Sequence, residues 1–345
     1  MFEGISSLIK NTEIIGLDIG THSIKIVEID HRRNGQFLTT FAITNHFVDL
    51  DGYWDSNTLR NIANTVDELM NKSNFVGIKT VMSIRSKDVY VTTMDFEAKM
   101  SEKSIREEIN RQAQFFLPLP PEQMRLSYDL VNTPTLSGKK RIIINATPDY
   151  VIENGRNLLE HLNLDGEAIE NATLSHIRSC LDIQPTTTIL IDIGGHHTVI
   201  STVVNNNLRN STFVPSGTQT IAKDMSELIG VSIEIGEGFM KDLNLVDLAH
   251  LPKPFLEYLE VLRDEVTTFM ALNKQIGQIT ERIVVTGGGA NTPGILEFLS
   301  NIGVPISIAN PLSTVVLHEG IIPFISPVQN QLAVAIGLAK RTDTL

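Results

Sequence analysis

The sequence predicts an α/β protein with largely buried sheets and two related cores. Strand-like and helix-like segments alternate along the 345 residues, an order typical of sheets covered by helices. Two apolar runs, 14–20 and 188–195, each end in Asp-x-Gly and lead into a second strand-like run. At about 150 residues per domain, the chain has room for two domains, or for one large domain with an insertion. We therefore expect two homologous halves.

The first half begins with a hairpin formed by 14–20 and 23–29. Helical spacing of apolar residues then predicts a helix over 57–71. A helix that begins near Ser101 should end at the proline-rich run 117–121, because proline cannot continue the hydrogen-bond ladder. Strands are also expected over 80–85 and 88–94, and a pair of strands over 125–133 and 140–146 around a turn at 135–138. Helices are expected over 101–116, 149–162 and 168–181.

The second half repeats the hairpin and then becomes mainly helical. Residues 198–204 alternate as the second strand of that hairpin, and 282–286 reads as a buried strand that leads into three glycines. The helices expected here cover 217–229, 232–243, 253–276, 291–301 and 329–341.

Composition and charge exclude several classes of protein. The formal net charge is −12, whereas nucleic-acid-binding proteins need a basic face. Cys180 is the only cysteine, which excludes an intrachain disulfide and a cysteine-cluster metal site and fits a reducing compartment. No run of about 18 apolar residues occurs, and residues 1–10 lack the basic region of a signal peptide. We expect a cytoplasmic protein.

Three glycine motifs carry the strongest functional signal, because each follows a strand of the buried type. Asp-x-Gly alone is usually turn chemistry, and three glycines alone are usually a loop. All three motifs in this order predict a nucleotide site. The candidate nucleotide-binding residues in them are Asp18, Gly20, Thr21, His22, Ser23, Lys25, Asp192, Gly194, Gly195, His196, Gly287, Gly288 and Gly289.

The chemistry of these motifs fits a polyphosphate with a magnesium ion. Backbone N–H groups in two glycine turns can approach phosphate oxygens without side-chain clash. Asp18 and Asp192 can hold Mg²⁺ mostly through water, since magnesium dehydrates reluctantly. Lys25 can offset phosphate charge, and the bare backbone of the triple glycine can carry a ribose and base. P-loop and dinucleotide fingerprints do not occur.

With these motifs the chain resembles the actin-like ATPase superfamily, whose members share two phosphate motifs and an adenosine motif in this order. Within it, the sequence is similar to the PilM family of type IV pilus assembly proteins, which is related to the cell-division protein FtsA. The resemblance covers essentially the whole chain and includes 16–25, 106–120, 146–150 and 335–339. It implies ATP and Mg²⁺ as cofactors.

The resemblance also implies an actin-like fold of two lobes, with duplicated mixed-sheet cores and an inserted small α+β subdomain. The parts expected from it are a first-lobe core (12–87, 165–185 and 329–342), the inserted subdomain (88–164), a second-lobe core (186–228 and 280–328) and a helical subdomain (229–279).

Several residues have two possible roles. Glu237 and Lys241 are four apart on an expected helix, and either belong to the nucleotide pocket, as the resemblance implies, or form a surface pair. His196 and its neighbour are a turn feature or a phosphate contact, and not a metal pair, because adjacent strand residues point to opposite faces. Glu170 lies near the stretch where hydrolysing relatives position water, but its expected helix could equally place it in solvent. We therefore expect ATP binding with slow or absent hydrolysis.

For partners, the resemblance implies a cytoplasmic protein held at the inner membrane by the N-terminal tail of a PilN-like protein. That tail would lie in a groove beside the inserted subdomain, and the protein would link it to the pilus motor ATPases. Phe115, Phe116 and Leu117 are candidates for the groove wall or for its supporting core. Self-association is also compatible with the sequence.

Three other interpretations stay open. An FtsA-like filament protein would polymerise with nucleotide, although the last residues, 340–345, form no clear amphipathic anchor. A sugar or acetate kinase of the same superfamily would transfer phosphate to a small acceptor, and the small insertion argues against it. The cytoplasmic part of a type II secretion protein would be followed by a membrane span.

Overall fold

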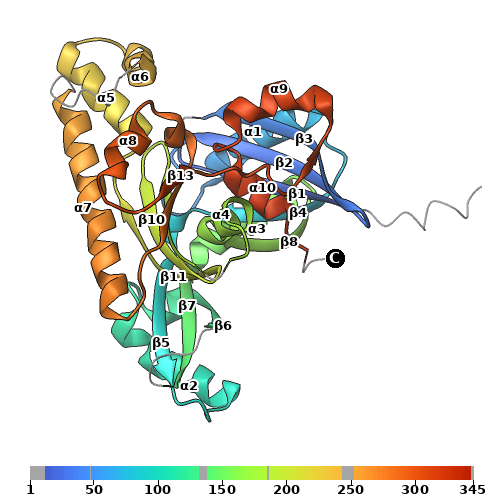
Figure 1. Ribbon diagram of the computed structural model, residues 1–345. Coiled ribbons are helices and arrows are strands. Elements are labelled where there is room, and N and C mark those ends of the chain that lie inside the picture. The colour runs from blue at the N-terminus through green and yellow to red at the C-terminus, as the bar shows by residue number, and fades with distance from the viewer. Residues whose placement is uncertain (1–11, 47, 132–137, 185, 243–251, 343–345) are drawn as a thin grey trace, which may run out of the picture. The chain divides into compact units, whose positions relative to one another are not determined.

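The computed structural model describes residues 12–46, 48–131, 138–184, 186–242 and 252–342. The chain folds into two compact units, each of which is built from separate stretches of sequence (Figure 1). Unit 1 comprises Met1–Ile84, Glu153–Ser179 and Pro311–Leu345, and unit 2 comprises Arg85–Ile152 and Cys180–Asn310.

Unit 1 contains a six-stranded mixed sheet in the order β14-β3-β2-β1-β4-β8. The hairpin of β1 and β2 is antiparallel, whereas β4 is parallel to both β1 and β8. The strands are β1 (Glu13–Ile19), β2 (Ser23–Arg32), β3 (Gly35–Asn45), β4 (Lys79–Ile84), β8 (Asp165–Asn171) and β14 (Val316–Leu317).

Helices cover this sheet, and their apolar residues form the core of unit 1. Ile62 and Val66 of α1 and Leu158 of α3 pack with strand residues such as Ile15 and Met82. The helices are α1 (Ser56–Lys72), α3 (Asp149–His161), α4 (Ala172–Cys180), α9 (Ile322–Ile325) and α10 (Ala333–Ala339). Asp55 caps α1, because its side chain accepts a hydrogen bond from the Thr58 N–H.

Small residues let α10 approach the sheet closely. A Cβ atom on Gly16 of β1 would lie 2.0 Å from the Ala335 carbonyl oxygen, and one on Gly337 would lie 2.0 Å from that of Ser175. No real Cβ contact is that short, so both positions require glycine. The small-residue pattern of 335–339 therefore fixes how α10 packs between β1 and α4.

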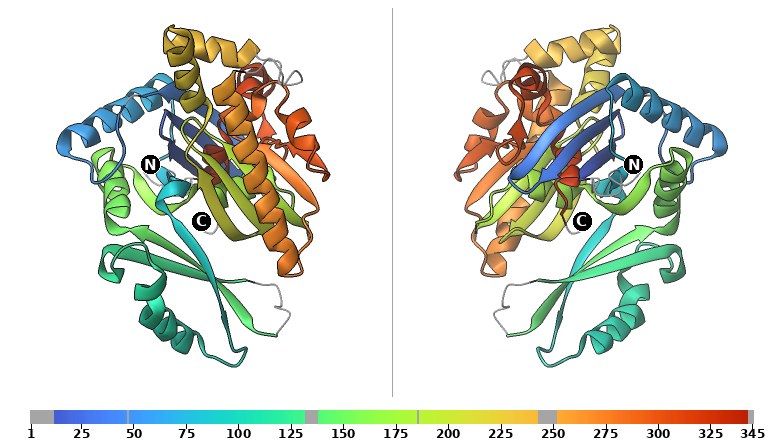
Figure 2. Two further views of the ribbon diagram at one scale, coloured as in Figure 1. Left: turned by 90° about the vertical axis from the view of Figure 1, so that its left-hand side faces the viewer. Right: turned by 90° about the vertical axis from the view of Figure 1, so that its right-hand side faces the viewer.

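Unit 2 contains a five-stranded mixed sheet in the order β11-β10-β9-β12-β13. Its strands are β9 (Thr187–Ile193), β10 (Thr198–Val204), β11 (Asn207–Val214), β12 (Arg282–Thr286) and β13 (Ile306–Ile308). Its helices are α5 (Thr218–Ile229), α6 (Ile233–Asp242), α7 (Lys253–Gln275) and α8 (Ile295–Ser300). The long helix α7 lies across one face of the sheet (Figure 2).

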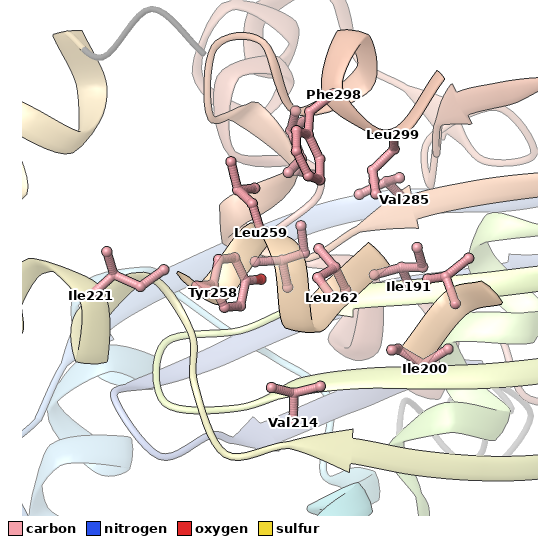
Figure 3. Close-up of a cluster of buried hydrophobic side chains, with 14 of the residues drawn as sticks. Ile191, Ile200, Val214, Ile221, Tyr258, Leu259, Leu262, Val285, Phe298 and Leu299 are labelled. Carbon is pink, nitrogen blue, oxygen red and sulfur yellow. The ribbon is translucent and has the colours of Figure 1, made fainter. Parts of the chain in front are cut away.

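Apolar residues of α7 fill the core of unit 2. Figure 3 shows Leu259 and Leu262 of α7 beside Ile191 and Ile200 of the sheet and Phe298 of α8. All five side chains are at most 5% exposed. Burial of such side chains is the main source of stability for this layer of helix on sheet.

A second, three-stranded sheet in unit 2 has the order β5-β7-β6 and is covered by α2. Ile105 and Ile109 of α2 pack on Phe96, Ile142 and Ile144 of the strands. The elements are β5 (Tyr90–Phe96), α2 (Glu102–Phe116), β6 (Met124–Val131) and β7 (Lys140–Pro148). Among the described residues, short 3-10 turns lie at Ser86–Asp88, Pro121–Gln123, Gly288–Asn291, Glu319–Ile321 and Ser326–Val328.

Three predicted helices begin or end elsewhere. The prediction of a helix over 168–181 was wrong at its start, because Ala168–Asn171 completes β8 and pairs with β4, and α4 follows. The helix expected over 291–301 begins only at Ile295, since Gly294 has a φ of +84°. That expected over 329–341 is confined to Ala333–Ala339. The predicted turn at 135–138 and the predicted strand and helix ends at 133 and 243 lie, apart from Gly138, outside the described residues.

The described residues contain no helix that is both long enough and apolar enough to cross a bilayer. The longest, α7, has 23 residues and carries charged side chains along its length. The four-part division of the chain expected from the resemblance stays a prediction.

Candidate functional site

The β1–β2 turn of unit 1 holds the first glycine motif around a buried carboxylate. Asp18, which is 6% exposed, accepts hydrogen bonds from Ser83 Oγ at 2.7 Å and from Lys25 Nζ at 2.9 Å. The Gly20 N–H donates to the Ser23 carbonyl at 3.0 Å and closes the turn. Thr21, like Ser23, is half-buried. The structure thus pairs Lys25 with Asp18, a contact that the sequence alone did not predict.

His46, just after β3, ties this turn to the sheet. Its Nδ1 accepts from the Val48 N–H at 3.2 Å, which leaves Nε2 to donate to the Gly20 carbonyl at 2.8 Å. Its backbone N–H donates to the His22 carbonyl at 2.9 Å. His46 therefore holds both sides of the turn. The sequence-based prediction missed it because it assigned no strand to Gly35–Asn45, which brings this residue under the turn.

The β9–β10 turn of unit 2 has the same backbone closure around the second motif. The Gly194 N–H donates to the His197 carbonyl at 3.0 Å. Asp192 holds the same position as Asp18, but the residue opposite it on the partner strand is Val199. His196 lies exposed in this turn, a position that fits a turn feature and a phosphate contact alike, so both roles stay predictions.

The N-terminus of α5 packs on the β9–β10 turn. The N–H groups of Thr218 and Gln219 donate to the carbonyls of Gly194 and Gly195 at 3.0 and 2.7 Å. At the N-cap Gly217, a Cβ atom would lie 2.4 Å from the Gly194 oxygen. Two helix N–H groups, which would otherwise lack partners, are therefore used to fix the turn.

The third motif lies directly beside the second within unit 2. Because β12 runs parallel to β9, Thr286 is paired with Asp192. Gly287 has a φ of +85°, and a Cβ atom there would lie 2.3 Å from Asp192 Oδ1. A Cβ atom on Gly289 would lie 2.2 Å from Ile193 Cγ2. Gly288 is exposed, so this loop presents bare backbone to its surroundings.

A buried phenol lies beneath the second turn. Tyr258 of α7 shares a 2.8 Å hydrogen bond with Thr198 Oγ1. Burial raises the pKa of Tyr258, and the nearby Asp192 carboxylate raises it further. The phenol therefore stays neutral and acts as a fixed support. This supporting role of Tyr258 could not be predicted from the sequence, because a tyrosine at an apolar position of a helix also fits an ordinary core.

The remaining candidate nucleotide residues lie on α6. Glu237 is half-buried, and Lys241 belongs to the same helix, although its side chain lies outside what the structure describes. A Cβ atom on Gly236 would lie 2.5 Å from the Ala222 carbonyl oxygen, so α6 packs closely on α5. Among the described side chains, that of Glu237 makes no hydrogen bond to the glycine turns, and the roles expected for Glu237 and Lys241 stay predictions.

Glu170 lies neither on a helix nor in solvent. It is 8% exposed on β8, and its carboxylate accepts from Ser175 Oγ at 2.6 Å, Arg178 Nη1 at 2.7 Å and Arg341 Nη1 at 3.0 Å. The expectation of a helical Glu170 was therefore wrong, because strand pairing with β4 overrides the local helical pattern. Its ion pairs anchor α4 and the end of the chain after α10.

The three candidates for a partner groove differ in exposure. Phe115, on α2, is 76% exposed, whereas Phe116 packs against the apolar cluster below α2. Leu117 is half-buried at the C-cap of the helix. Phe116 thus has the supporting-core position, and Phe115 is available at the surface.

Comparisons with known proteins match the whole fold. A protein in a solved structure described as a PilM-PilN type IV pilus biogenesis complex has a TM-score of 0.81, with 16% identity over 96% of this chain and 98% of that chain. The ethanolamine utilization protein EutJ from Carboxydothermus hydrogenoformans has a TM-score of 0.55, with 14% identity over 95% and 89%. MreB5 of Spiroplasma citri bound to AMPPNP has a TM-score of 0.53, with 13% identity over 95% of both chains.

These neighbours show an actin-like ATPase fold, as expected. The family model for the type IV pilus assembly protein PilM matches residues 16–343. This range includes both hairpin turns, the triple glycine and α10. The chain therefore belongs to the PilM family of type IV pilus assembly proteins.

Proposed function

We propose that the chain is an ATP-binding scaffold of type IV pilus assembly, held at the inner membrane through a PilN-like partner and linked to the pilus motor ATPases. The observation that carries the nucleotide part is the arrangement of Asp192 and Gly287 in unit 2. A carboxylate at a strand end lies beside a loop whose backbone must stay free of side chains. Such bare backbone admits close approach of a ligand.

The residues present fit a Mg-nucleotide. In a Mg-nucleotide the magnesium ion would be held mainly by phosphates and water, so the site would need few protein ligands. Asp192, at the end of β9 and beside Gly287 of the glycine loop, would orient that water. Bound Mg²⁺ would neutralise phosphate charge. Gly287, Gly288 and Gly289 would carry the ribose and base.

Asp18 would have a different role from Asp192. Its two oxygens already accept from Ser83 and Lys25, so its charge is offset within unit 1. Lys25 would share its remaining donors with a phosphate, because an ammonium group has three N–H donors. Gly20, Thr21, His22 and Ser23 would form the surrounding turn. Fluorescence titration of ATP into Gly288→Val tests the loop: the folded variant should bind at least tenfold more weakly, and unchanged affinity would contradict its assignment.

The charge cluster around Glu170 supports binding with slow or absent hydrolysis. A general base or a residue that positions water needs a free lone pair directed at the water, whereas Glu170 receives bonds from one serine and two arginines. Nucleotide would then act as a structural ligand that stabilises the folded chain. Phosphate release should be equally slow in wild type and in Glu170→Gln, and hydrolysis at about 1 s⁻¹ or faster would contradict this view.

The partner proposal rests on family membership and on the structural similarity to the protein of the PilM-PilN complex. Phe115 is the exposed aromatic residue among the three groove candidates, and aromatic residues are frequent anchors in interfaces. Anisotropy titration of a labelled PilN N-terminal peptide from the same organism tests it, with and without Mg-ATP. Saturable binding supports the scaffold, and a shift with ATP measures coupling between the sites. No binding by a protein that still binds ATP would contradict it.

An FtsA-like filament is the second candidate, because the resemblance to the PilM family extends to FtsA and the fold also matches MreB5 of Spiroplasma citri. Sedimentation with and without Mg-ATP separates the two functions. The scaffold predicts that the chain stays in the supernatant in both conditions, and nucleotide-dependent pelleting would favour the filament.

A further inference from the structure

Unit 2 contains a large cavity that the functions above do not use. Its volume is about 1010 Å³, and its walls come from β5, β11 and the C-terminal end of α7. None of the candidate nucleotide residues lines it, nor does Phe115, Phe116 or Leu117. A cavity of this size lies at the upper end of the usual range for small ligands, about 300–1,000 Å³, and has room for a stretch of polypeptide.

Two open strand edges border this cavity. β5 is the outer strand of the three-stranded sheet and β11 is the outer strand of the five-stranded sheet. The two strands are in contact (Figure 1), yet among the described residues no strand pairs with the outer side of either. The lining stretches 91–93 and 210–212 contain no proline or charged residue, and the charged residues near them are Asp95 on β5 and Arg209 on β11. Proline and lysine commonly protect natural edge strands, so the uncharged stretch of each edge is suited to pairing.

Apolar side chains are exposed around the same cavity. Tyr90 of β5, Phe213 of β11 and Leu272 of α7 line it, together with Ile276 just after α7. They are 38%, 45%, 43% and 45% exposed respectively. Exposed apolar side chains that gather on one concave surface mark an interaction site rather than chance exposure.

The charge of the cavity has the opposite sign to that of the chain. The lining includes three basic residues, Lys87, Arg141 and Arg209, and two acidic ones, whereas the whole chain has a net charge of −12. One of these acids, Asp95, is engaged by Arg141 through bonds of 2.6 and 2.7 Å. Burial and the neighbouring Arg141 lower the pKa of Arg209 to about 10, although the Asp95 carboxylate raises it, so a further carboxylate nearby would stabilise its charged form.

We propose that this cavity binds an extended, acidic segment of a partner protein that adds its backbone to the open edges of β5 and β11. Its alternate apolar side chains contact Phe213, Leu272 and Ile276, and its carboxylates lie near Arg209 and Arg141. Strand addition supplies affinity through backbone hydrogen bonds, and the pockets for alternate side chains supply specificity. The charge balance selects acidic over basic sequences.

Fluorescence anisotropy with the full chain tests this surface. The probes are three labelled peptide sets of about eight residues, enough to span a strand, in which Val or Ile alternates with Glu or Asp, with Lys, or with Gln. We expect the acidic set to bind at least tenfold tighter than the lysine set, and added salt to reduce the difference. Arg209→Glu should reverse the preference, and Leu272→Asp should weaken binding by all sets.

Val261→Asp is the matched control, because Val261 is also exposed on α7, at 47%, and lies outside the cavity lining. It should bind the acidic peptides like wild type. Equal affinity for acidic and lysine peptides, no binding by any acidic peptide, or an unchanged preference in folded Arg209→Glu would overturn the proposal. The chain could instead self-associate through this surface. If Leu272→Asp abolished that self-association and acidic peptides did not inhibit it, the surface would belong to a second copy of the chain. Titration of the same variants with Mg-ATP shows independently whether the nucleotide site is intact, so failure of the peptide surface and failure of the nucleotide site can be told apart.

Discussion

The two hairpin turns share one backbone but hold their aspartates differently. In both, a glycine N–H donates at 3.0 Å to the carbonyl three residues later. Asp18 is buried and faces Lys25 across its hairpin, whereas Asp192 is half-buried and faces Val199. One carboxylate is thus neutralised within its own unit, and the other lies beside bare glycine backbone. The duplicated core thus repeats the same turn, and the two aspartates differ in burial and in the residue that faces them on the second strand.

The largest expected effect is a loss of stability when Gly287, which packs against Asp192 at the β9–β10 turn, is replaced. Gly287→Val places a branched side chain at a φ of +85° and 2.3 Å from Asp192 Oδ1. Backbone strain and overpacking together should lower the free energy of unfolding by about 4 kcal/mol. Thermal unfolding of purified protein measures this loss. Gly288→Val is the control, because Gly288 is exposed and its melting temperature should stay within a few degrees of wild type.

The next effect tests the pair that distinguishes unit 1. Lys25→Met leaves the Asp18 carboxylate buried without its cation, and the exposed fractions of the two side chains are only 13% and 9%. Breaking a buried pair in this way should destabilise the protein by about 3 kcal/mol. Denaturant unfolding measures it. The double variant Asp18→Asn/Lys25→Met should recover much of the loss, and a double variant as unstable as the single one would show that the pair itself is not the cause.

A smaller effect is expected on magnesium at the second turn. Asp192→Ala should reduce the affinity for Mg-ATP by about 10–100-fold, the usual cost of losing an outer-shell metal contact, while affinity for ATP in EDTA should change little. Calorimetric titration in both buffers measures the difference. Val199→Ala, which changes the facing residue without touching the carboxylate, serves as the control. Loss of affinity that is the same in both buffers would argue against the magnesium role of Asp192.

The smallest effect concerns a more exposed ion pair. The Arg141 hydrogen bond lowers the pKa of Asp95 below its usual 3.8. The carboxylate therefore contributes stability above that pH and loses it as the pH falls below about 4. Its contribution should be under about 1 kcal/mol, since both groups are partly solvated. The unfolding free energy of Asp95→Asn should approach that of wild type at pH 3, and a constant difference from pH 3 to 7 would contradict this linkage.

Much of the fold was predictable because its signals are local. The Asp-x-Gly runs and the apolar strands specify both hairpins, and Ser101 caps α2 as expected, with its side chain accepting from the Ser104 N–H. The error at Ala168–Asn171 arose because pairing with β4 is a long-range contact, which overrides local helical spacing. β3 was missed because its polar threonines gave only weak alternation.

The site was predictable in its glycines and acids but not in their supports. Asp192 and Gly287 are 95 positions apart in the sequence and become neighbours only because β9 and β12 run parallel. Ser83 and Tyr258 each act through one specific side-chain hydrogen bond, and His46 acts through three bonds around the turn. Such a role has no periodic pattern in the sequence, so single residues of these types could not be separated from ordinary core or turn residues.

The central claim is that the glycine turns bind nucleotide with magnesium. Isothermal titration of ATP into the wild-type protein, in Mg²⁺ and then in EDTA, tests it most directly. The account predicts saturable binding of one ATP per chain that is tighter with Mg²⁺. If folded protein shows no heat of binding and no rise in melting temperature at millimolar Mg-ATP, the glycine turns are structural only, and the nucleotide role of this chain is wrong.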